Sequence, residues 1–161
     1  MESSQLAHQL GEALLAKGWK LACAESCTGG GIAATVTEIA GCSQWFDRGF
    51  VSYSNLAKQE MLGVGKSTLD AHGAVSEAVV KEMVAGALTR SQARVAVAVS
   101  GIAGPDGGTD EKPVGMVCLA WQVEGKEPVV HTEHFNGDRA SVREQTVFSA
   151  LQGLLSAVVQ N

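Results

Sequence analysis

Apolar side chains recur along this chain with the two spacings that distinguish helices from strands. Leu6, Leu10 and Leu14 repeat at the helical interval, and Gly18 follows them as glycine often follows a helix end. Similar patterns, bounded by residues that favour helix termini, predict four further helices. The five predicted helices cover residues 6–18, 29–41, 55–63, 76–91 and 138–159.

Nearly continuous apolar runs lie between these helices and predict buried strands. Residues 19–25, 46–54 and 94–100 are such runs, and 114–125 with 128–137 form an antiparallel pair that turns at Glu124–Glu127. Strands that alternate with helices predict a layered α/β fold, and the terminal hairpin makes its sheet mixed. We therefore expect one domain over residues 1–161, a three-layer α/β/α sandwich with a mixed β-sheet.

Composition excludes several classes of protein. Of the 161 residues, 45% are hydrophobic and 18% are charged, which is typical of a folded globular domain. The net charge of −5 argues against sequence-independent binding of nucleic acid, and no apolar run is long enough to cross a bilayer. The N-terminus lacks the basic start and apolar core of a signal peptide, so we expect a cytoplasmic protein. The four cysteines show no metal spacing and are expected to be free thiols.

The segment "AESCTGG", residues 24–30, is the first candidate site. It places Ser26 at a strand-to-helix corner, where a helix N-terminus offers free N–H groups. A serine there can attack a carbonyl while those N–H groups stabilise the oxyanion. The same corner can hold a phosphate, or Ser26 or Thr28 can merely cap the helix. Cys27 offers a rival thiol nucleophile.

A nucleophilic serine needs a base, and none of the four histidines is well placed to be one. A desolvated lysine can replace histidine, and Lys58 follows a predicted strand in the first turn of a predicted helix. Tyr53, at the end of that strand, has a hydroxyl that can relay a proton or fix the lysine. Asn55 is the expected cap of the helix. The alternatives are a solvated lysine and a tyrosine with an exposed hydroxyl.

Two further segments suit an anionic or oxyanionic group. The loop after the strand 94–100 contains Gly101 and Gly104, which let the backbone approach a ligand closely. Arg139 and Arg143 lie four residues apart near a helix start, and paired guanidinium groups suit a phosphate or a carboxylate. A flexible loop and a solvated helix face are the simpler interpretations.

Taken together, these segments resemble one family, the C-terminal domain of the competence/damage-inducible protein CinA. The resemblance covers nearly the whole chain, in the same order, and this chain is similar to the short, single-domain form. The matching motifs are "AESCTGG" (24–30), "FDRGFVSYSNLAK" (46–58), "HGAVSE" (72–77), "SGIAGPDGG" (100–108), "KPVG" (112–115) and "FNGDR" (135–139).

The resemblance implies an activity. The free-standing family domain is a nicotinamide-nucleotide amidase, which converts nicotinamide mononucleotide to nicotinate mononucleotide and ammonia in pyridine-nucleotide salvage. It implies Ser26 as the nucleophile, with Tyr53 and Lys58 as catalytic partners, and it implies no cofactor or metal. The residues expected to contact the substrate are Thr28, Gly29, Gly30, Asn55, Gly101, Ile102, Ala103, Gly104, Arg139 and Arg143.

Two other kinds of function use the same residues differently. A non-catalytic nucleotide-binding module needs the glycine loops and arginines but no serine–lysine pair. An interaction role in competence or DNA damage is suggested by the family name, although the acidic composition gives DNA contact no support. The expected partner is a small-molecule substrate rather than nucleic acid or a membrane. The apolar hairpin favours a homodimer if its edge joins a second copy.

Overall fold

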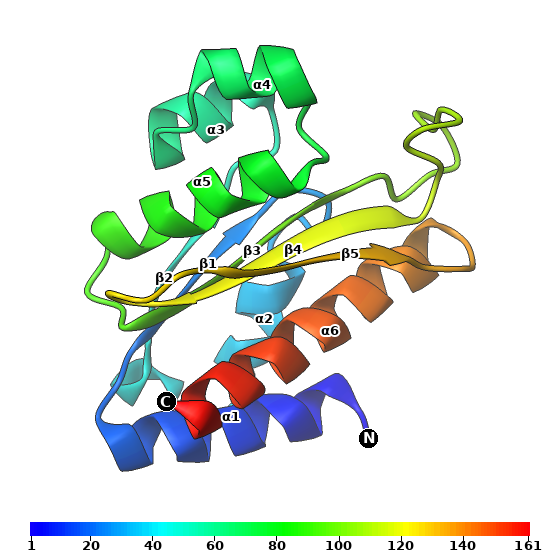
Figure 1. Ribbon diagram of the computed structural model, residues 1–161. Coiled ribbons are helices and arrows are strands. Elements are labelled where there is room, and N and C mark those ends of the chain that lie inside the picture. Colours follow the sequence, from blue (N-terminus) through cyan, green and yellow to red (C-terminus); the bar gives the residue numbers. More distant parts are fainter.

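The computed structural model describes all 161 residues and contains one five-stranded sheet with helices on both faces (Figure 1). The strand order is β2-β1-β3-β4-β5. β1 (Leu21–Glu25) lies parallel to β2 (Phe46–Val51) and to β3 (Val95–Gly101). β4 (Met116–Val123) is antiparallel to β3 and to β5 (Val129–His134). The predicted three-layer α/β architecture with a mixed sheet is confirmed.

Two layers of helices cover the sheet. α1, α2 and α6 pack on one face, and α3, α4 and α5 lie on the other (Figure 1). None of these helices combines the length and the apolar character that crossing a bilayer requires. The helices are α1 (Ser3–Lys17), α2 (Gly31–Thr37), α3 (Asn55–Leu62), α4 (Lys66–His72), α5 (Glu77–Thr89) and α6 (Arg139–Gln160), with a 3₁₀ turn, η1, at Cys42–Gln44.

Side-chain size alternates along the central strand β3. Its valines, at 95, 97 and 99, belong to the core formed with α1, α2 and α6. Ala96 and Ala98 point the other way, into the core formed with α5. Because successive strand residues face opposite sides of a sheet, this alternation builds both cores at once. The small alanines leave room for α5 to pack closely.

α3 is held against α5 by a close backbone contact. Gly86 of α5 faces the carbonyl oxygen of Leu62 in the last turn of α3, and a Cβ atom at position 86 would collide with that oxygen. Gly63 then ends α3 in the left-handed conformation, with φ of 72°. α3 therefore has a fixed position, which matters because it carries Lys58.

Several element boundaries differ from the prediction. The helix predicted over 29–41 begins only at Gly31, because Gly29 and Gly30 have φ of 58° and 103°, which a right-handed helix cannot contain. Ser54, not Asn55, caps α3, since its Oγ accepts the N–H of Ala57 at 3.0 Å. The helix α4 was not predicted, because seven residues with one buried side chain give little periodic signal. The predicted helix ends at Gly18, Ser76 and Asp138 are confirmed.

Candidate active site

Ser26 directly follows the last residue of β1, at the carboxyl end of the central parallel strands. Its main-chain N–H donates to the carbonyl oxygen of Val99 on β3 at 3.2 Å, and the residue is 7% exposed. Ligands of open α/β sheets bind outside this end of the strands. The serine hydroxyl therefore lies where the sequence predicted a site, close to the surface but largely shielded from water.

Lys58 is the direct neighbour of the serine hydroxyl. It is the fourth residue of α3 and is only 1% exposed. Its Nζ atom lies 3.0 Å from Ser26 Oγ and donates to the main-chain carbonyl oxygen of Tyr53 at 2.9 Å. The amine and the hydroxyl, 32 positions apart in the chain, thus form a hydrogen-bonded pair.

The surroundings of Lys58 favour the uncharged amine. No carboxylate lies within ion-pair distance of Nζ. Burial lowers the pKa of Lys58 below its ordinary value, because water no longer solvates the ammonium form. A neutral amine has a lone pair that can accept the serine proton, so this pair is chemically equipped for general-base activation of a hydroxyl.

The predicted proton relay through the phenol of Tyr53 does not fit this geometry. The residue is 62% exposed, and its hydroxyl makes no hydrogen bond with Ser26 or Lys58. Its main-chain carbonyl oxygen does the positioning instead, accepting from Lys58 Nζ and, at 3.4 Å, from Ser26 Oγ. Asn55, which opens α3, is also exposed, and its side chain has no hydrogen-bond partner.

The turn between β1 and α2 is tied together by a carboxylate that sequence reasoning missed. Glu25 is fully buried and accepts the hydroxyl of Thr28 at 2.5 Å. The same carboxylate accepts the N–H groups of Ile32 and Ala33 at 2.9 and 3.0 Å. The hydroxyl of Thr28 is therefore directed inward, and the residue is 1% exposed. The sequence does contain one indication of this buried carboxylate, because Glu25 is a charged residue at the end of an apolar strand.

Two arginines of α6 hold the two glycine-containing loops at this edge of the sheet. Arg143 donates from Nε to the carbonyl oxygen of Cys27 at 3.1 Å and from Nη2 to that of Thr28 at 3.0 Å. Arg139, one turn earlier, donates from Nη1 to the carbonyl oxygen of Gly104 at 2.8 Å. One face of one helix therefore binds both loops, which leave the same edge of the sheet because β1 and β3 are parallel.

Unpaired main-chain N–H groups follow the serine in the chain. Gly29 N–H donates to the carbonyl oxygen of Ser26 at 3.1 Å, whereas the N–H groups of Cys27, Thr28 and Gly30 have no acceptor within the protein. The carbonyl of Cys27 and the N–H of Thr28 belong to one trans peptide and point in opposite directions, so this N–H faces away from Arg143.

Only some of the main-chain N–H groups of the glycine loop after β3 are free. Ile102 N–H is already used, because it donates to Met116 at 2.9 Å. The N–H groups of Ala103 and Gly104 have no acceptor within the protein. Gly101 packs against β4 so closely that a Cβ atom would lie 2.6 Å from a methyl group of Val117.

The cysteines are free thiols, and three of the four are buried. Burial raises the pKa of Cys27 to about 11, so this thiol is protonated at neutral pH and is a poor nucleophile. No three His, Cys, Asp or Glu side chains are grouped as a metal site requires. The local chemistry therefore favours Ser26 over its neighbour Cys27.

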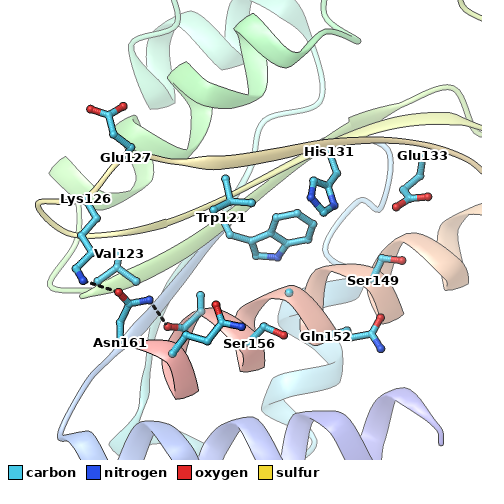
Figure 2. A pocket seen from close by; sticks show the side chains of 14 residues that line it. Trp121, Val123, Lys126, Glu127, His131, Glu133, Ser149, Gln152, Ser156 and Asn161 are labelled. Carbon is cyan, nitrogen blue, oxygen red and sulfur yellow. Dashed lines mark hydrogen bonds between the residues drawn. The ribbon is translucent and has the colours of Figure 1, made fainter.

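Two cavities open on the surface of the protein. One of about 750 Å³ includes Thr28, Gly31 and Arg143, and so adjoins the serine turn from the side of α2 and α6. Another, of about 430 Å³, lies between the β4–β5 hairpin and α6, with Trp121 and His131 on its wall (Figure 2). The second, smaller cavity shares no residue with the Ser26 site, whereas the larger one adjoins it.

Comparison with known proteins finds relatives that match this chain over nearly its whole length. Nicotinamide-nucleotide amidohydrolase PncC of Enterobacter agglomerans is 54% identical over 157 residues, covering 98% of this chain and 96% of that protein. The protein of the same name from Escherichia coli K12 is 53% identical over 160 residues, covering 99% and 97% of the two chains.

Solved structures of similar proteins also match nearly the whole chain. The competence/damage inducible protein CihA from Agrobacterium tumefaciens superposes with a TM-score of 0.94 at 46% identity, covering 97% of this chain and 95% of that one. A CinA superfamily protein from Klebsiella pneumoniae gives 0.95 at 40% identity over 100% of both chains. The protein-family model of the CinA C-terminal domain matches residues 3–158 of this chain. The chain therefore belongs to the CinA C-terminal domain family.

Proposed function

We propose that this protein hydrolyses the carboxamide of nicotinamide mononucleotide, giving nicotinate mononucleotide and ammonia. The names of its full-length relatives support the substrate. One observation supports the chemistry: Lys58 Nζ, buried without a counter-ion, lies 3.0 Å from Ser26 Oγ. These products would feed pyridine-nucleotide salvage.

Acylation begins with transfer of the Ser26 hydroxyl proton to the neutral amine of Lys58. The oxygen then bonds to the carboxamide carbon, and the carbonyl electron pair moves onto its oxygen. Of the unpaired N–H groups at this edge of the sheet, we assign those of Cys27, Thr28 and Gly30, which directly follow Ser26 in the chain, as the donors for this oxyanion. Lys58 returns the proton to the amide nitrogen, the C–N bond breaks, and ammonia leaves an ester on Ser26.

Deacylation repeats these steps with water. The neutral amine of Lys58 takes a proton from water, and the hydroxide oxygen bonds to the ester carbon. When the resulting oxyanion collapses, the Ser26 oxygen leaves and recovers its proton from Lys58. The overall reaction consumes one water for each ammonia released, and the carbonyl oxygen of Tyr53 orients the amine throughout.

The phosphate of the substrate requires a cation at the mouth of the site. Arg143 uses two of its N–H groups to bind carbonyl oxygens, whereas Arg139 uses one. Arg139 therefore keeps more donors for a phosphate, and we assign it that role. Arg143 is assigned to holding the serine turn.

Ammonia release from nicotinamide mononucleotide tests the proposal. Wild-type protein should release ammonia in equal amount to nicotinate mononucleotide, and Ser26→Ala should lose this activity. Cys27→Ala is the matched control at the neighbouring position and should keep it. Undiminished turnover by Ser26→Ala would remove the serine from its role, and tight binding of the mononucleotide without turnover by wild type would favour a non-catalytic binding module.

A further inference from the structure

A second ionisable group lies beside the nucleophile and takes no part in the proposed proton transfers. Glu25 is completely buried, and no lysine, arginine or histidine lies within ion-pair distance of its carboxylate. Four neutral donors surround it instead, namely the hydroxyl of Thr28, two main-chain N–H groups and, at 3.6 Å, the thiol of Cys23. Burying a carboxylate is unfavourable unless such donors satisfy it, so this arrangement needs a physical reason.

The donors of Glu25 lie in β1, in the serine turn (residues 26–30) and in the first turn of α2. Ile32 and Ala33 are the second and third residues of α2, the positions that a capping side chain normally serves. The residue at the cap position, Gly30, has no side chain, and its φ of 103° favours glycine. Glu25 thus caps α2 from the end of β1, and its bond to Thr28 fixes the residues between.

Arg143 of α6 binds the same turn. Its guanidinium group binds the carbonyl oxygens of Cys27 and Thr28, while Glu25 binds the Thr28 side chain. Two elements distant in sequence, β1 and α6, therefore fix the peptide planes that follow the nucleophile. The orientation of a peptide plane determines where its N–H group points.

We propose that Glu25 is a positioning residue for the oxyanion site. Through Thr28 and the start of α2, it holds the turn so that the free N–H groups of Cys27, Thr28 and Gly30 meet the oxyanion that forms after attack by Ser26. This inference rests on the proposed amidase function. A negative charge near a developing oxyanion opposes it by Coulomb repulsion, so Glu25 acts through geometry, and the two effects have opposite signs.

Glu25→Gln distinguishes the positioning effect from the charge effect. It keeps the side-chain shape but removes the negative charge, which should favour the oxyanion, and one acceptor oxygen, which should loosen the turn. Positioning predicts that kcat falls by about 10²-fold, the usual consequence of a misplaced catalytic group, with KM unchanged. The pH at which kcat/KM rises on the acidic side should not change, because that rise reports the pKa of Lys58 and Lys58 is not altered. An unchanged or higher kcat would overturn the proposal.

Thr28 provides a second test that does not depend on how well Glu25→Gln folds. Thr28→Val removes the hydroxyl and should lower kcat, whereas Thr28→Ser keeps the hydroxyl and should lose much less. Thr146→Val is the matched control, because Thr146 is an equally buried threonine whose hydroxyl bonds to Val142 within α6. Equal losses in Thr28→Val and Thr28→Ser would overturn the proposal.

Covalent labelling distinguishes failure of this proposal from failure of the proposed function. A fluorophosphonate reagent reacts with activated serines and does not require the natural substrate. Its rate of reaction with Ser26 should fall in Glu25→Gln and Thr28→Val but not in Thr146→Val. If wild type is labelled but does not hydrolyse the mononucleotide, the amidase function fails while the labelling rates still decide the role of Glu25. Equal labelling rates in wild type, Glu25→Gln and Thr28→Val would contradict that role.

Discussion

Lys58→Met replaces the buried amine with an uncharged side chain of similar length and tests whether the neutral amine is the base. In wild type, kcat/KM should rise with pH up to the lowered pKa of Lys58 and then level off, because only the neutral amine accepts the serine proton. One proton is involved, so the rise should be about tenfold per pH unit on the acidic side. Lys58→Met should lose about 10²- to 10⁴-fold in kcat/KM, or roughly 3 to 5 kcal/mol of transition-state stabilisation, and its residual rate should lack this limb.

The same ionisation should affect folding. In the unfolded chain Lys58 titrates near its ordinary value of 10.5, whereas burial lowers its pKa in the folded protein. The unfolded state therefore binds more protons between these two values, and stability falls as pH decreases through that window, by at most about 1.4 kcal/mol per pH unit. Below the folded-state pKa the loss is complete and constant.

A difference measurement isolates this effect from the thiols. Burial raises the pKa of Cys27 to about 11 from 9.0, so its contribution to stability is lost as pH rises through that interval, opposite in sign to that of Lys58. The free energies of unfolding of wild type and Lys58→Met, measured in urea at a series of pH values, share the contribution of the thiols except for the charge coupling between Cys27 and Lys58, so their difference reports mainly on Lys58. The difference in the free energy of unfolding between the two proteins should grow as pH falls from 10.5 and become constant below the folded-state pKa of Lys58. A flat difference, together with a flat activity profile, would refute the assignment of a neutral base.

Three further substitutions test other parts of the site. Arg139→Gln should raise KM for the mononucleotide by about 10- to 100-fold, the effect of losing a charge-assisted hydrogen bond, without changing KM for the nicotinamide riboside, which lacks the phosphate; an equal rise for both would contradict the phosphate assignment. Cys27→Ser should retain ammonia release, and wild type should be insensitive to iodoacetamide at neutral pH, since its Cys27 thiol is then protonated; loss of activity in Cys27→Ser with a normal circular dichroism spectrum would reopen the thiol mechanism. Gly30→Ala should lower the free energy of unfolding in urea by about 1 to 2 kcal/mol, because φ of 103° disfavours a side chain; no loss would show that the turn tolerates a different backbone conformation.

The sequence predicted those parts of the site that depend on periodicity and on local motifs. The apolar run before "ESCTGG" placed Ser26 at the end of a strand, and the pattern after Tyr53 placed Lys58 on a helix. The contact between the two side chains followed from the parallel order of β1 and β2, because both chain segments leave the sheet at the same edge. The catalytic roles themselves, and the homodimer expected from the β4–β5 hairpin, stay predictions.

Other features depend on backbone groups and buried contacts that a residue pattern does not display. Lys58 is oriented by the carbonyl of Tyr53 rather than by its phenol, and every residue type has such a carbonyl. The partners of Arg143 are also main-chain carbonyl oxygens, which a residue pattern does not reveal. Its positive charge had instead predicted an anionic ligand. Glu25 caps a helix that begins six residues later, beyond the range of ordinary capping motifs.

If Ser26 is the nucleophile that the amine of Lys58 activates, the covalent intermediate forms on its side-chain oxygen, and locating that intermediate tests the mechanism. Protein mixed with nicotinamide mononucleotide, quenched in acid during turnover and digested, can be examined by mass spectrometry for the acyl group. We expect a nicotinate mononucleotide ester on the peptide that contains Ser26, and no ester in Ser26→Ala. An adduct on Cys27, or undiminished ammonia release from Ser26→Ala, would contradict it.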